Sequence, residues 1–91
     1  MIAVTPRYVF AQEDIERLKF AKALAHHIMG ATSDLNGDDD QAIREYNESL
    51  VYNPNSYLTR LRLGIYYARM GMLEEALNHL TQVSVLNPDD I

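Results

Sequence analysis

The chain repeats itself at a period of thirty-four residues, and this period constrains its fold more than any other feature. Gly30 and Gly64 stand one period apart. The same spacing relates Gly37 to Gly71, Ala42 to Ala76, Val51 to Val85, and Asn53-Pro54 to Asn87-Pro88. Most of these residues are glycine, proline or alanine, which backbone geometry and close packing select. A period of this length is typical of stacked-repeat proteins.

Apolar residues recur in steps of three and four, which predicts amphipathic helices. The pattern predicts helices over residues 12–35, 40–52, 57–70 and 73–86. Thr5-Pro6 offers an alternative start for the first helix, so its beginning near residue 6 or residue 12 stays open. Glycine and Asn-Pro signals end the segments. We therefore expect an all-α fold of four to five helices, arranged as antiparallel pairs.

The same signals divide the chain into four parts. We expect a tail or helix start at 1–11, a helical extension continuous with the first repeat at 12–22, and repeats at 23–56 and 57–90. Repeat arrays usually need about three units and a polar cap. The outer face of the last helix has no partner in this chain. Either the chain is part of a longer array, or it forms a homo-oligomer through that helix.

The second repeat resembles the tetratricopeptide repeat family, whose pattern reads Trp-x2-Leu-Gly-x2-Tyr, Ala-x3-Phe and Pro. The matching residues are Leu63, Gly64, Tyr67, Ala76, Leu80 and Pro88. The first repeat matches more weakly, through Gly30, Ala42, Tyr46 and Pro54. Arg60 and His26 hold the tryptophan position, and Ser33 replaces the tyrosine. The resemblance implies a right-handed α-solenoid in which the glycines and alanines allow close helix packing and the large residues fill the space between pairs.

The resemblance also implies that the first helix of each pair lines a concave groove. The groove residues would be Leu24, His27, Ala31, Asp34, Leu58, Leu61, Arg62, Ile65 and Arg69. This wall is apolar with two arginines at its edge, which suits a peptide or helix with an apolar stripe and an acidic group. Some family members grip a terminal carboxylate with lysine and asparagine. His27 and Ala31 hold two of those positions here, so we expect no such clamp.

Composition excludes several other classes. Thirteen acidic residues outnumber eight basic ones, for a net charge of −5. Nucleic acids and anionic membranes need a basic surface, so neither is an expected partner. Without cysteine the chain has no disulfide and no cysteine-bearing zinc site. No apolar run is long enough to cross a bilayer, and no signal peptide is evident, which leaves the compartment open with a slight preference for the cytoplasm.

No residue pattern indicates an enzyme, a cofactor or a metal centre. Adjacent His26 and His27 point about 100° apart on a helix and do not converge on one metal. One near-match is a calcium loop at 34–45. Its alternating candidates are Asp34, Asn36, Asp38, Asp40 and Glu45. Gly37 stands at the wrong position for that loop. The simpler interpretation makes Asp38-Asp39-Asp40 the cap and first turn of the next helix.

These observations favour a non-enzymatic module that binds a protein or peptide in a groove. A self-assembly domain is the alternative, and a calcium-binding loop is the third possibility. No residue identifies the partner.

Overall fold

The computed structural model describes residues 4–86, with side chains from residue 11 onward. These residues form four α-helices and no strand. The helices are α1 (Val4–Leu35), α2 (Asp39–Tyr52), α3 (Tyr57–Arg69) and α4 (Leu73–Leu86). The prediction of an all-α fold is confirmed. The first helix begins before both of the starts that the sequence left open, and Pro88 lies outside the described residues.

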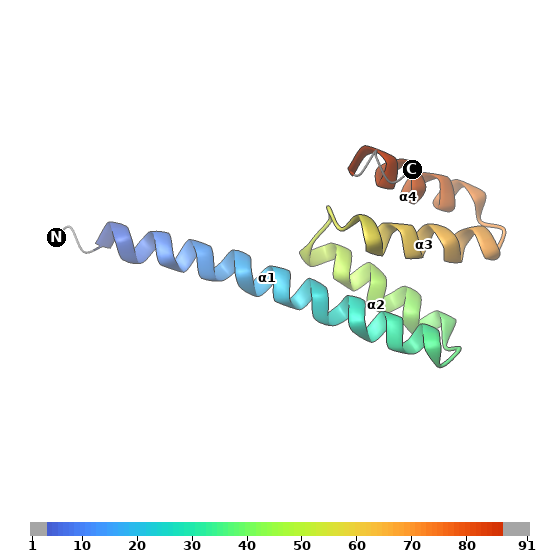
Figure 1. Ribbon diagram of the computed structural model, residues 1–91, viewed down its shortest axis with the longest axis horizontal. Helices are drawn as coiled ribbons and strands as arrows, with labels where there is room; N and C mark the ends of the chain where they lie inside the picture. Colours follow the sequence, from blue (N-terminus) through green and yellow to red (C-terminus); the bar gives the residue numbers. More distant parts are fainter. Residues whose placement is uncertain (1–3, 87–91) are drawn as a thin grey trace.

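The helices pack as two pairs, α1 with α2 and α3 with α4, and the pairs meet where α2 contacts α3 (Figure 1). Short turns join the members of each pair, so the paired helices run antiparallel, as the repeat pattern predicts. Figure 1 shows α2 and α3 in the middle of the stack, with α1 and α4 on the outside. The chain therefore has one internal junction between repeats and one outer helix at each end of the described stack.

Local signals determine where the helices end. Gly37 and Gly71 have φ angles of 78° and 77°, a left-handed conformation that glycine adopts without steric cost. Asp38 caps α2 by accepting a hydrogen bond from the Gln41 amide at 3.2 Å, and Asp39 and Asp40 follow in the first turn. The prediction that this acidic run begins a helix is confirmed. Ser56 caps α3 in the same way.

The core is centred on Tyr46, which is completely buried. Tyr46 and Ala42 of α2 form one cluster with Leu63 and Tyr66 of α3. The Tyr46 ring lies directly against Gly30 of α1, where an added Cβ would stand 2.7 Å from the ring. That distance is too short for any side chain, so α1 and α2 pack this closely only because residue 30 is glycine.

The first part of α1 projects away from the stack (Figure 1). Every side chain from Ala11 to Lys22 is exposed, and burial begins at Ala23. The helix has 32 residues, so it is about 48 Å long at 1.5 Å per residue. Among residues 4–86, no helix combines the length and the apolar character needed to cross a membrane.

Two buried tyrosine hydroxyls differ in their partners. The Tyr66 hydroxyl donates a hydrogen bond of 2.6 Å to Asp34 Oδ1, which ties α3 to α1. The Tyr46 hydroxyl has no partner among the described residues. A buried polar group without a partner loses the free energy of its hydration, at a cost of about 1–3 kcal/mol.

Replacing each repeat glycine by alanine tests the close approach of the helices. Alanine favours a helix by about 1 kcal/mol over glycine, whereas overpacking a core costs about 1–3 kcal/mol. At Gly30 the new methyl meets the buried Tyr46 ring, so we expect Gly30→Ala to lower the free energy of unfolding by about 1–2 kcal/mol. Gly64 faces the flexible Leu80 side chain instead. Gly64→Ala should change stability little, and urea denaturation that finds equal effects would contradict this packing.

Replacing each buried tyrosine by phenylalanine tests the two hydroxyls. Tyr46→Phe removes a hydroxyl that has no partner in the described part of the chain, so it should raise the free energy of unfolding by about 1 kcal/mol. Tyr66→Phe removes the hydrogen bond to Asp34 and should lower it by about 1–2 kcal/mol. Thermal and urea denaturation measure both changes. Destabilisation by Tyr46→Phe would show that its hydroxyl is bonded in solution.

Candidate interaction groove

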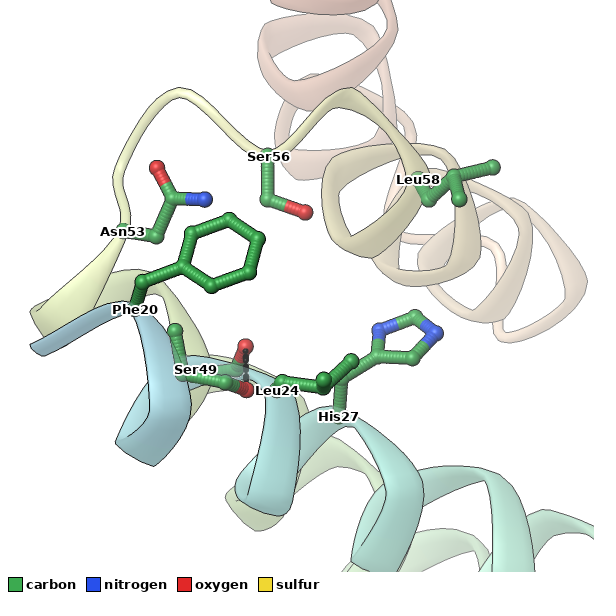
Figure 2. A pocket seen from close by; sticks show the side chains of 8 residues that line it. Phe20, Leu24, His27, Ser49, Asn53, Ser56 and Leu58 are labelled. Carbon is green, nitrogen blue, oxygen red and sulfur yellow. Dashed lines mark hydrogen bonds between the residues drawn. The ribbon is translucent and has the colours of Figure 1, made fainter. Parts of the chain in front are cut away.

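A pocket of about 180 Å³ opens between α1, the end of α2 and the start of α3 (Figure 2). Its lining residues are Phe20, Ala23, Leu24, His27, Ser49, Asn53, Ser56 and Leu58. They come from both repeats, because α1 belongs to the first pair and α3 to the second. The pocket therefore exists only when the two helix pairs are stacked.

Large apolar side chains form the rim of this pocket. Phe20, Leu24 and Leu58 are 62%, 50% and 52% exposed. Figure 2 shows the Phe20 ring beneath the α2–α3 loop and Leu58 on the opposite side, at the start of α3. Exposed apolar groups gathered around a concavity mark sites where another molecule can bury them.

A buried hydrogen bond holds the floor of the pocket. The Ser49 hydroxyl donates to the Ala23 carbonyl at 2.7 Å, and Ser49 is almost completely buried (Figure 2). This bond fixes the last turns of α2 against α1. Because the α2–α3 loop follows immediately, it also positions Asn53 and Ser56 at the upper wall.

His27 connects the two first helices at the inner wall. A hydrogen bond of 2.9 Å joins His27 Nδ1 of α1 and Thr59 Oγ1 of α3. The His27 ring also packs against the Tyr46 ring, with centroids 5.2 Å apart. Burial lowers the pKa of His27, and the nearby positive charge of Arg62 lowers it further. The neutral form of His27 is therefore favoured in the folded protein.

Two arginines of α3 add positive charge, Arg62 near His27 of the pocket wall and Arg69 at the far end of the helix. Arg62 and Arg69 are exposed, and among residues 11–86 neither takes part in an ion pair. The Arg69 guanidinium lies over the Tyr66 ring, 5.5 Å from its centroid. The Tyr66 hydroxyl in turn donates a hydrogen bond to the Asp34 carboxylate, so Asp34 is already partnered within the chain.

The structure brings part of the expected groove together. Leu24, His27 and Leu58 line one pocket, whereas the other expected residues lie outside it. Ala31, Asp34 and Leu61 are partly buried, and Ile65 is exposed. The sequence reasoning missed Phe20. It precedes Leu24 by one helical turn on the same side of α1, a four-residue spacing that could have identified it.

The acidic segment at 34–45 has separate structural roles. Asp38 caps α2, and Asp34 accepts from Tyr66. Glu45 contacts His26 Nδ1 at 2.7 Å and Gln41 Nε2 at 3.0 Å. Within the described part of the chain, no three His, Asp or Glu side chains are placed to share a metal ion.

Comparison of the chain with protein-family models, with curated proteins and with solved structures gives no match.

The lowered pKa of His27 predicts how stability depends on pH. The ordinary pKa is 6.5, and the folded value is lower. Between these values the unfolded chain binds a proton that the folded chain does not, so stability falls as pH drops below 6.5. Above pH 6.5 His27 is neutral in both the folded and the unfolded chain, so the stability then no longer changes with pH through this residue. His79 shifts in the same direction, through burial and Arg60.

Substitutions of Arg62 and Arg60 distinguish the pKa of His27 from that of His79. Arg62→Gln should raise the pKa of His27 and leave that of His79 unchanged, whereas Arg60→Gln should do the reverse. Because burial is the larger cause, each pKa should stay below 6.5. NMR titration of the imidazole signals measures both values. A common shift of both histidines in either variant would contradict the placement of the charges.

Proposed function

We propose that this chain is a non-enzymatic interaction module, which binds a peptide by taking one large apolar side chain into the pocket between α1 and α3. The observation that carries the proposal is the rim of Phe20, Leu24 and Leu58, which leaves about half of each side chain exposed around a concavity. Covering such a side chain completely contributes about 1.5–3 kcal/mol relative to leaving it exposed.

The size of the pocket supports a side chain as its occupant. Small-molecule and cofactor sites are usually about 300–1,000 Å³. A pocket of about 180 Å³ is smaller than that range. An anchor residue from a peptide fits this volume, while the rest of the peptide would lie along the open groove between the first helices.

The positive charges along α3, of which Arg62 lies near the pocket residue His27, support an acidic group on the same peptide. Arg62 and Arg69 project from α3 without ion-pair partners among residues 11–86. Exposed charges of this kind contribute more to orientation and association rate than to affinity. We therefore propose a ligand with one large apolar residue and an aspartate or glutamate nearby.

The resemblance to tetratricopeptide repeats supports the same function. Gly30 and Gly64 each meet a large side chain of the partner helix, Tyr46 and Leu80, at equivalent positions. We propose that the two pairs are repeats of this type, whose first helices form the binding groove.

Selection from a library of random peptides displayed on phage tests the proposal. Peptides enriched on the wild-type chain should contain one leucine, isoleucine, methionine or phenylalanine with an acidic residue within a few positions. Calorimetry of one enriched peptide then gives an affinity. Enrichment of basic peptides, or no enrichment above an empty support, would contradict the proposal.

Matched leucine substitutions locate the binding site. Leu58→Asp places a charge in the pocket wall, so it should weaken peptide binding at least tenfold, which corresponds to about 1.4 kcal/mol. Leu77→Asp makes the same change on α4, outside the pocket, and should leave the affinity unchanged. Arg62→Glu should weaken binding of the acidic peptide and reduce its dependence on salt. Equal losses from the two leucine variants would place the site elsewhere.

A further inference from the structure

The thirty-four-residue period makes the internal junction a template for a second contact. At this junction α3 buries Thr59, Leu63 and Tyr66, which are 0%, 0% and 2% exposed. Leu63 and Tyr66 share a core cluster with Tyr46 where α2 meets α3, and Thr59 bonds His27 of α1. In the sequence α1 stands one period before α3, and α4 stands one period after α2.

On α1 the equivalent side chains are uncovered. Thirty-four residues before Thr59, Leu63 and Tyr66 stand Ala25, Met29 and Thr32. All three are exposed, and Met29 is 42% exposed. We call these three residues the α1 stacking face. It lies on α1 where a preceding second helix would pack if the internal junction were repeated.

On α4 the other half of the junction is uncovered in part, because Leu80 is half-buried against Gly64. Ile43 and Tyr46 of α2 belong to or pack against the core cluster. Their equivalents one period later are Leu77 and Leu80. Leu77 is 66% exposed, and Leu73, one turn before it, is 70% exposed. We call Leu73, Leu77 and Leu80 the α4 stacking face.

We propose that a second copy of this chain covers these faces, with the α4 stacking face of one copy packed against the α1 stacking face of the next. The contact would reproduce the α2–α3 junction between molecules. Each copy carries one α1 stacking face and one α4 stacking face, so a second copy can supply the missing half at either end. Because the two faces differ, the contact is head-to-tail and can continue from copy to copy.

Charge determines the conditions under which this association is observed. Each copy has a net charge of −5, so two copies repel each other at long range. Neither stacking face contains a carboxylate or any other charged side chain. Added salt screens the repulsion and leaves the apolar contact intact. Association should therefore increase with both protein concentration and salt, whereas binding of an acidic peptide beside Arg62 should weaken with salt.

The test uses two single variants in sedimentation equilibrium. Met29→Asp blocks the α1 stacking face and leaves the α4 face free, and Leu77→Asp does the opposite. We expect the wild type to exceed the mass of one chain at high concentration, and each variant alone to remain a monomer. Mixed in equal amounts, the variants should form a complex of twice the single-chain mass. Leu73→Asp should behave like Leu77→Asp.

A surface variant serves as the control for the added charge. Asn78→Asp adds the same charge to an exposed position of α4 outside the α4 stacking face, and it should associate like the wild type. Circular dichroism confirms that each variant keeps its helices. A wild type that stays monomeric at every concentration and salt would overturn the proposal. So would variants that fail to complement, or one variant that still associates by itself. Peptide binding through Leu58 is measured separately, so either result stands without the other.

Discussion

The contact between the Tyr46 ring and the bare backbone of Gly30 is the constraint on which the rest of the structure depends. Tyr46 is completely buried, and its ring also lies 5.2 Å from the His27 ring and 6.3 Å from the Tyr66 ring. One side chain of α2 therefore contacts both α1 and α3. It reaches both because α1 has no Cβ at residue 30, which brings the helices close enough for a single ring to join them.

Directional hydrogen bonds then set how the second helix pair sits on the first. His27 with Thr59, and Tyr66 with Asp34, each join α1 to α3. Each hydrogen bond contributes only about 1 kcal/mol to the free energy of folding. A buried polar group left without a partner, however, costs about 1–3 kcal/mol. The apolar cluster supplies the driving force for stacking, and these bonds select the register. The pocket follows from that register, since it brings Leu58 opposite Leu24.

Local chemistry explains why the helices could be predicted so closely. The Gly37 and Gly71 turns and the Asp38 and Ser56 caps act over a few residues, so their effect can be read without knowing the fold. The groove could be predicted only in part. The family resemblance predicted Leu24, His27 and Leu58 in one groove, but Phe20 belongs to the projecting part of α1. The spacing of four residues places Phe20 on the same side of α1 as Leu24, but whether it reaches the pocket depends on the angle at which α1 passes the α2–α3 loop.

The sequence by itself determined an all-α fold of helices in antiparallel pairs and a period of thirty-four residues, because these follow from short-range backbone preferences and from the regular spacing of residues. Tertiary structure alone decided which equivalent positions are buried. Leu63 and Met29 occupy the same position in the period. Leu63 is nevertheless buried against α2, whereas Met29 is 42% exposed. The physical reason is that burial depends on the neighbour across the interface, and the period specifies the face of a helix without specifying what packs against it.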